Sequence, residues 1–194
     1  MSSNLVIRPA TRQGTVEAIK TSDTPITCNS QDVPIILGMM RATAAEQCAS
    51  SNVKATEQDL LDNIDFGDSD TSNPRGRFTK IILAVAPEGI AGMATYFLTF
   101  AAWLGRSGVC LEDLYVAPEY RRRGYARDLI QAIAKEANEL GCSRMEWQCY
   151  KDNHRALQFY QSLGAKVMDP IAYLRLDKED MEKLAEEKTA SFLN

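Results

Sequence analysis

Residues 116–126 read V-A-P-E-Y-R-R-R-G-Y-A, so three consecutive arginines run directly into a glycine. The stretch follows the apolar residues 114–116 and precedes residues 127–140, whose apolar positions recur at helical spacing. It therefore predicts a turn from a strand into a helix. The first turn of a helix leaves backbone N–H groups unpaired and adds the positive end of the helix dipole, so such a turn can hold an anion.

Two interpretations of this turn compete. It could be a solvated basic segment that simply ends in a glycine. Alternatively, Gly124 lets the backbone approach a ligand, the small Ala126 keeps that approach open, and the arginines add charge for a diphosphate. The spacing R-x-x-G-x-A directly after a strand favours phosphate binding. The stretch is neither a Walker loop nor a dinucleotide-binding G-x-G-x-x-G.

Composition limits the class of protein. The 194 residues are 45% hydrophobic and 25% charged, which predicts one ordinary core and a single domain, residues 1–194. A net charge of -4 argues against general nucleic-acid binding. The five cysteines contain no C-x-x-C pair and have only His154 to join them, which disfavours a metal site and indicates thiols in a reducing compartment.

Targeting and membrane signals are missing from the sequence as given. The first residues show no charged segment followed by an apolar run, and no stretch approaches the ~20 apolar residues of a membrane span. We therefore expect no membrane partner and a cytoplasmic location.

The pattern of apolar residues alternates between strand and helix periods, which predicts an α/β or α+β domain. Strands are expected at residues 5–8, 79–86, 90–100, 109–116, 144–149 and 173–176. Helices are expected at residues 33–49, after a capping box at 56–59, at 127–140, at 153–163, and in a C-terminal helix and tail, 178–194. A loop or insertion is expected at residues 12–31, and a flexible loop at 67–77.

Two motifs resemble a known family. Residues 121–126 fit the pattern [QR]-x-x-G-x-[GA], and residues 153–165 match N-x-x-A-x-x-F-Y-x-x-x-G-[FA]. Both resemble the GNAT superfamily of N-acetyltransferases, whose first motif binds the pyrophosphate of acetyl-CoA. Residues 96–105 and the L-E-D-L-Y-V of 111–116 are further similar to the spermidine/spermine (diamine) N-acetyltransferases and their thialysine-acetylating relatives. The resemblance covers about the last two-thirds of the chain, plus residues 6–11 and 56–61.

The resemblance implies a GNAT fold, with a mixed central sheet flanked by helices. Acetyl-CoA would bind as co-substrate, without a metal, where the strands ending at Val116 and Cys149 splay apart. A homodimer is also implied. The residues that the resemblance assigns to acetyl-CoA are Leu114, Tyr115, Val116, Arg121, Arg122, Arg123, Gly124, Tyr125, Ala126, Arg127, Asn153, Arg155 and Ala156.

Acetyl transfer to an amine needs a base. A primary amine with a pKa near ~10.4 is almost wholly protonated at neutral pH, so a proton must leave before the nitrogen can attack the thioester. Glu112 is the candidate base, directly or through water, because it lies in the strand that the resemblance places along acetyl-CoA. The alternative is a solvent-facing strand carboxylate with no chemical role.

The departing thiolate needs a proton in return. Tyr160 occupies the family's acid position, and a phenol with a pKa near ~10 is a reasonable donor. Taken alone, the pair Phe159 and Tyr160 is more often core, but the motif reverses that preference and leaves Phe159 in the core. A covalent route is disfavoured because Cys110 and Cys149 lie in expected strands with no histidine signal nearby.

The substrate is less well defined. Acidic side chains could surround an ammonium group, which suits a polyamine, a diamine or a lysine-like amino acid. Acetylation of a protein or peptide amine remains an alternative, as does a non-catalytic acyl-CoA-binding module, although the presence of Tyr160 and Glu112 disfavours the latter. The residues expected around the amine are Glu46, Gln47, Glu112, Glu146, Trp147, Gln148 and Asp169.

Overall fold

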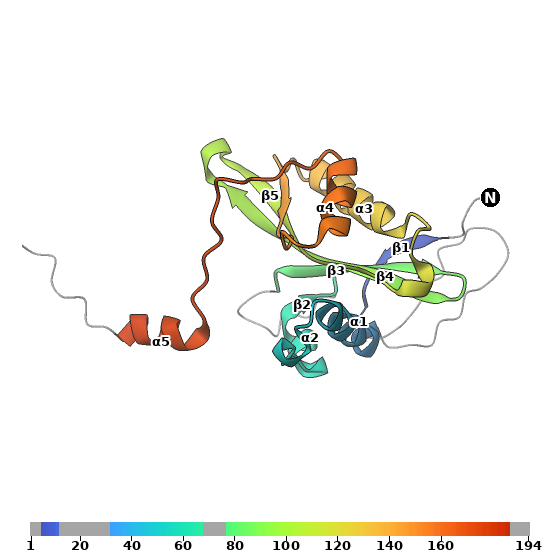
Figure 1. Cartoon of the computed structure of the whole chain (residues 1–194), viewed down its shortest axis with the longest axis horizontal. Coiled ribbons are helices and arrows are strands. Elements are labelled where there is room, and N and C mark those ends of the chain that lie inside the picture. Colours follow the sequence, from blue (N-terminus) through green and yellow to red (C-terminus); the bar gives the residue numbers. More distant parts are fainter. Residues whose placement is uncertain (1–4, 12–31, 68–76, 187–194) are drawn as a thin grey trace, which may run out of the picture. The chain divides into compact units, whose positions relative to one another are not determined.

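The computed structural model describes residues 5–11, 32–67 and 77–186 (Figure 1). The predicted segment 12–31 and most of the predicted loop 67–77 lie outside the described residues. The chain divides into two compact units, Met1–Gln148 and Cys149–Asn194, and each is described by itself. The single domain expected from composition stays a prediction.

The first unit is built on a mixed sheet of six strands, and the mixed sheet is the one that the family resemblance implies. Five of the strands overlap predicted strands, and the sixth, Ile64–Asp65, was not predicted. The order is β1-β3-β4-β5-β6, and β2 pairs with β3. The pairs β1–β3, β3–β4 and β4–β5 are antiparallel, whereas β2–β3 and β5–β6 are parallel. The strands are β1 (Val6–Pro9), β2 (Ile64–Asp65), β3 (Thr79–Ala86), β4 (Gly89–Ala101), β5 (Arg106–Val116) and β6 (Met145–Trp147).

Helices cover both faces of this sheet. Figure 1 shows α1 and α2 on one side and α3 on the other. The predicted capping box is confirmed, since the Thr56 side chain accepts from the N–H of Asp59 and the Asp59 carboxylate accepts from the N–H of Thr56. The helices of this unit are α1 (Asp32–Glu46), α2 (Glu57–Asn63) and α3 (Tyr125–Glu139), with short 3-10 turns η1 (Ser50–Asn52), η2 (Ala102–Leu104) and η3 (Pro118–Tyr120).

The main core lies between the sheet and the pair α1 and α2. Strand register places Leu83, Met93 and Tyr115 side by side across three strands, and all three are buried. Each such apolar side chain contributes about 2 kcal/mol when it leaves water. On the opposite face, Leu129 and Ile133 are buried at a spacing of four residues, which gives α3 one apolar stripe.

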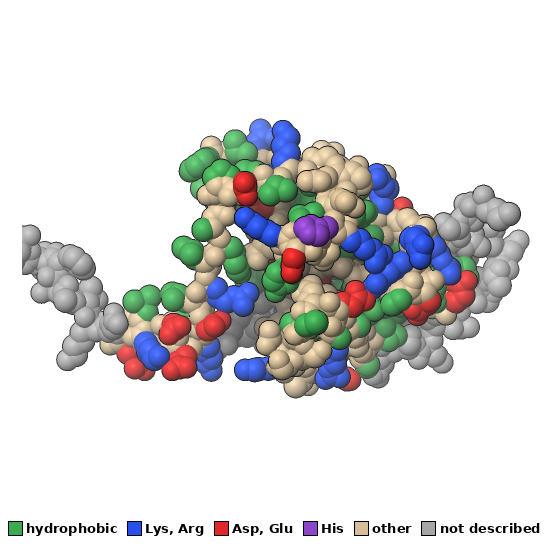
Figure 2. Space-filling model, viewed as in Figure 1, with side chains coloured by type: hydrophobic (Ala, Val, Ile, Leu, Met, Phe, Trp, Pro, Cys, Tyr) green, Lys and Arg blue, Asp and Glu red, His purple; other side chains and the backbone are tan. Residues whose placement is uncertain are grey.

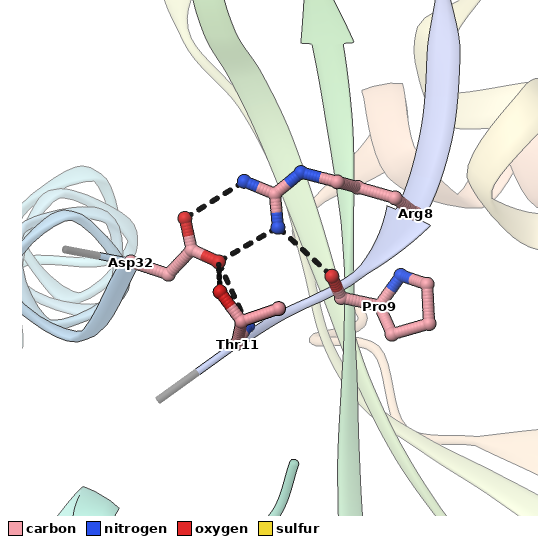
Figure 3. Close-up of polar contacts among 4 residues, drawn as sticks. All are labelled: Arg8, Pro9, Thr11 and Asp32. Atoms are coloured by element: carbon pink, nitrogen blue, oxygen red, sulfur yellow. Dashed lines mark hydrogen bonds and ion pairs between the residues drawn. The ribbon is translucent and has the colours of Figure 1, made fainter. Parts of the chain in front are cut away.

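A partly buried ion pair, with its carboxylate fully buried, anchors the start of α1. Arg8 donates to both oxygens of Asp32, at 2.7 and 2.8 Å, and Thr11 donates from its N–H (2.8 Å) and its hydroxyl (3.1 Å) (Figure 3). Burial raises the pKa of Asp32. The hydrogen bonds from Arg8 and Thr11 and the positive charge of Arg8 together outweigh burial and hold the pKa below its usual value. The carboxylate therefore ties α1 to β1.

A second charged cluster joins α3 to the sheet. Glu136 accepts from Lys80 on β3 at 2.7 Å and from the hydroxyl of Tyr96 on β4 at 2.5 Å. Burial raises the pKa of Glu136, but these two donors and the charge of Lys80 lower it further than burial raises it. The C-terminal end of α3 is thus fixed to the sheet, and the arginine-rich turn lies at the other end of the same helix.

The second unit contains α4 (His154–Ser162) and α5 (Lys178–Glu186). The strand predicted at residues 173–176 is wrong, because residues 165–177 form neither helix nor strand. A strand needs a neighbour to pair its backbone groups, and the described part of this unit contains no other strand. In both units, no helix within the described ranges is long and apolar enough to cross a membrane.

Candidate active site

The sheet opens along the second half of β5. Strand β6 pairs with β5 only at Val109, Cys110 and Leu111, and the last of these lies opposite Trp147. Residues 112–116 continue the strand, and within the described part of the first unit residues 113–116 pair with β4 alone. Their outer edge therefore presents backbone groups that can receive an extended ligand, apart from the carbonyl oxygen of Val116, which accepts from Nε of Arg121.

A β-bulge lies where the opening begins. Thr95 pairs with Asp113 and Tyr96 pairs with Leu111, so Glu112 is an extra residue in β5 with no counterpart on β4. Bulges bend a strand and re-aim a side chain, and they are common beside active sites. The Glu112 side chain is exposed, so the candidate base meets solvent at the start of the open edge.

The neighbouring carboxylate has a different environment. The hydroxyl of Thr95 donates to Asp113 at 3.0 Å and accepts from the Asp113 N–H at 2.9 Å. Burial raises the pKa of Asp113, and the hydrogen bond from Thr95 only partly offsets that effect. Asp113 is thus held inside the fold, whereas Glu112 is the carboxylate of this pair that a substrate can reach.

The predicted amine-site residues of β6 lie beside the same opening. Glu146 is in register with Cys110 and is exposed, and Arg144 is paired with Glu146 at 2.9 Å. Trp147 is half-buried and Gln148 is exposed. Burial raises the pKa of the Cys110 thiol, and the charges of Glu112 and Glu146 raise it further, so Cys110 is a poor nucleophile at neutral pH.

The arginine-rich turn has the backbone of an anion site. Gly124 is the N-cap of α3 at φ 93° and has no side chain to cap the first turn. Arg122 is also left-handed, at φ 63°, a conformation that costs a residue with a side chain about 1–2 kcal/mol. Strain of this kind gathers at functional sites. Arg127 and Asp128 donate their N–H groups to the carbonyl oxygen of Gly124, so the N–H groups of residues 125 and 126 are the ones that suit an external acceptor.

The first arginine of the run points back to the fold. Its Nε donates to the carbonyl oxygen of Val116 at 2.8 Å, and its Nη2 forms an ion pair with Glu46, the last residue of α1. The guanidinium of Arg121 also lies 5.8 Å from the centre of the Tyr115 ring. Gln47 follows Glu46 and is exposed.

The other arginines extend outward. Arg123 donates to the carbonyl oxygen of Glu119 at 3.1 Å and stacks over Tyr120 at 5.2 Å. Arg122 and Arg127 are exposed. Figure 2 shows Lys and Arg side chains gathered over the segment that leads into α3. The positive charge that a diphosphate requires is therefore present around the helix start.

The remaining predicted residues belong to the second unit. Asn153 caps α4 by accepting from the N–H of Ala156 at 3.1 Å, and Arg155 is exposed in the first turn. Asp169 is exposed and forms an ion pair with Lys151 at 3.5 Å. Their roles toward acetyl-CoA and the amine stay predictions.

Tyr160 lies on α4, 5.4 Å from Phe159 between ring centres. Burial raises its pKa to about 12, with a smaller contribution from the charge of Cys149. The phenol is therefore fully protonated at neutral pH and can act as a proton donor. Across the described residues of both units, no three His, Cys, Asp or Glu side chains gather so that they could hold a metal ion.

A comparison with known families decides what this arrangement belongs to. The model of the acetyltransferase (GNAT) family matches residues 44–165. The chain belongs to the GNAT family of acetyltransferases. It is an N-acetyltransferase, and the open edge of β5 and the turn before α3 lie inside the matched region.

Curated relatives support this membership. The chain is 31% identical over 156 residues to thialysine N-epsilon-acetyltransferase of Bos taurus, a match that covers 77% of this chain and 89% of the relative. It is 32% identical over 95 residues to L-ornithine N5-acetyltransferase of Arabidopsis thaliana, covering 49% of this chain and 42% of the relative. The second match thus spans less than half of that relative's length.

Solved structures share the fold. An integron cassette protein of V. cholerae has a TM-score of 0.68 at 22% identity, covering 95% of this chain and 99% of that chain. An aminoglycoside acetyltransferase from a soil metagenomic sample has a TM-score of 0.63 at 17% identity, covering 89% and 97%. These likenesses confirm the predicted GNAT fold.

The structure of this GNAT chain adds one residue that the sequence reading missed. Gly92 on β4 is paired with Val116, and a Cβ at Gly92 would lie 2.5 Å from the carbonyl oxygen of Tyr115. Only glycine fits there, so Gly92 sets how closely β4 supports the open end of β5. A glycine inside a strand pattern is the signal that indicates such a close approach.

Proposed function

We propose that this GNAT enzyme transfers the acetyl group of acetyl-CoA to the side-chain primary amine of a small lysine-like amino acid or diamine. The observation that carries the proposal is the open edge of β5, residues 112–116, which leads to the turn before α3. The edge suits an extended chain with amide groups, and the turn suits the diphosphate at its end.

The amine class rests on the relatives and on charge. The two relatives are named for the N-epsilon of thialysine and the N5 of L-ornithine, which are side-chain nitrogens of basic amino acids. Glu112 exposes its carboxylate at the opening of the sheet, whereas the exposed carboxylate of Glu146 beside it is paired with Arg144. Carboxylates at such a place favour a cationic substrate over a neutral one.

Glu112 is proposed to accept the proton that the ammonium must lose. The neutral nitrogen then attacks the thioester carbon, a C–N bond forms, and the C–S bond breaks as its electrons move to sulfur. The nitrogen, which is positively charged after the attack, releases its second proton to solvent and becomes a neutral amide. Asp113 is a weaker candidate because its carboxylate is bonded to the hydroxyl of Thr95 inside the fold. Tyr160 is proposed to protonate the departing thiolate, since it holds its proton at neutral pH.

A CoA-release assay tests the function. We expect CoA release with lysine, ornithine, thialysine or a short diamine. Two blocked substrates make the test sharper, because Nα-acetyl-lysine keeps the side-chain amine and Nε-acetyl-lysine does not. Activity with the first and none with the second supports the proposal. Activity only with peptides, or with the Nε-blocked compound, would replace it with a peptide or α-amine acetyltransferase.

A further inference from the structure

Glu46 and Arg121 connect two distant parts of the first unit. Glu46 ends α1, and Arg121 is three residues before the N-cap of α3. Their ion pair is one of several contacts of the same guanidinium, whose Nε also donates to Val116. The Arg121 side chain is mostly buried, at 22% exposure, whereas Glu46 is 47% exposed.

These contacts fix the direction of the guanidinium. An arginine side chain is a planar fork, so donation from Nε to one acceptor and from Nη2 to another determines its plane. The ring of Tyr115, which belongs to the main core, supports the guanidinium from the side. The Arg121 side chain therefore contacts the end of β5, the end of α1 and the core. It binds the carbonyl oxygen of Val116, the residue after which the chain leaves the strand toward the turn.

We propose that Glu46 is a positioning residue of the acetyl-CoA turn, acting through Arg121, and not a ligand of the amine. The inference rests on the proposed function, because it concerns the same turn. It also revises the role that the sequence suggested for Glu46. The carboxylate that was expected to attract a substrate ammonium already has a cation of the protein itself as its partner.

The two roles predict opposite changes in a Glu46→Gln variant. Loss of the ion pair should let the turn relax, so acetyl-CoA binding should weaken by about fivefold, the upper range for a partly exposed pair. The KM for the amine should stay within about twofold of wild type. A substrate ligand would instead raise the KM for the amine and leave acetyl-CoA affinity unchanged.

The measurement is titration calorimetry with acetyl-CoA, combined with KM values for both substrates. Glu88→Gln is the matched control. Glu88 is an exposed glutamate in the turn between β3 and β4, and its replacement by Gln removes the same charge as Glu46→Gln. Arg121→Lys keeps the charge but not the fork, so it should weaken acetyl-CoA binding at least as much as Glu46→Gln.

A double variant completes the test. In an Arg121→Lys background, Glu46→Gln should have a smaller effect on acetyl-CoA affinity than it has alone, because the two residues act as one unit. Additive effects, or a change confined to the amine KM, would overturn the positioning role. A wild-type protein that binds acetyl-CoA but releases no CoA with any amine would overturn the proposed function and leave the positioning role supported or rejected by calorimetry alone.

Discussion

At the scale of single residues, the turn before α3 depends on backbone conformations that few side chains adopt. Gly124 lies at φ 93°, and the space where a Cβ would project is open, with Asp128 Oδ2 at 3.9 Å as its nearest neighbour. Glycine is therefore required here because of the positive φ, and not because a side chain would clash with its neighbours. Arg122 meets a similar demand with a side chain, at the cost of strain.

Replacing Gly124 with alanine should therefore act on the turn itself. We expect the φ strain to cost about 1–2 kcal/mol or to be relieved by a changed turn, and either outcome raises the KM for acetyl-CoA. Steady-state kinetics and a melting curve measure both effects. Gly141→Ala, also at positive φ (69°) but after α3, is the control for strain alone. Equal KM values in both variants would remove the turn from the cofactor site.

Tyr160 offers a test of the proton donor. Tyr160→Phe keeps the ring and removes only the hydroxyl, so kcat should fall by about 10²-fold while acetyl-CoA affinity and melting temperature stay near wild type. Phe159→Leu serves as a comparison for loss of ring packing without loss of a donor. Activity of Tyr160→Phe within a small factor of wild type would assign the proton to water or another group.

At the scale of elements, β5 combines a bulge and an open edge. If the bulge presents Glu112 as the base, Glu112→Gln should lower kcat/KM strongly at neutral pH and recover in part toward about pH 10, where more of the amine is already neutral. Profiles of kcat/KM from about pH 6 to 10 for both proteins decide the matter. Parallel profiles with a constant offset would leave Glu112 a binding role only, and melting temperature reports any structural loss.

How far the elements follow from sequence depends on where their causes lie. Strand β3 forms at its predicted bounds, and α2 starts at its predicted capping box, because a short apolar run before a turn and a capping box are both local signals. The bulge at Glu112 depends on the register between two strands, so alternation within one strand cannot show it. The Glu46–Arg121 pair is 75 residues apart in sequence, and nothing local indicates it. The strand predicted at 173–176 has no other strand to pair with in the described part of its unit.

In the second unit, too, the sequence predicts the helix better than the chemical role of its residues. Its motif from Asn153 onward predicted a helix, and α4 is confirmed with Asn153 as its cap. The motif also gave Tyr160 a role as an acid, which is chemistry that helical periodicity alone would have assigned to packing. The family resemblance alone indicated the role of Tyr160 as an acid, whereas the helical spacing of apolar residues indicated only that this segment is a helix.

At the scale of the whole molecule, stability should fall in acid. The pKa values of Asp32 and Glu136 are lower in the fold than in the unfolded chain, so their stabilisation is fully present above about pH 5 and is lost as the pH falls through the folded-state values. Asp113 acts oppositely, because its raised pKa costs stability at neutral pH and this cost disappears in acid. We expect the first two to dominate, with melting temperature falling below about pH 4.

Two variants check that assignment. Asp32→Asn leaves the partly buried Arg8 without its counter-ion, so it should cost about 3 kcal/mol at neutral pH, and the gap in stability to wild type should narrow as the pH falls below 4. Asp113→Asn keeps the bond to Thr95 and should stabilise the protein at neutral pH. Melting curves from about pH 3 to 7 measure both. A pH-independent gap for Asp32→Asn would mean that its carboxylate contributes through packing alone.

The two tryptophans of the chain lie in contrasting surroundings. Trp103, at the tip of the β4–β5 hairpin, is fully exposed, whereas Trp147 is half-buried at the last paired position before the sheet opens. Indole emission follows the polarity around the ring, so the protein carries a built-in optical reporter. In a Trp103→Phe background the fluorescence comes from Trp147 alone, and occupation of the opening can be followed in real time without a label or a coupled assay.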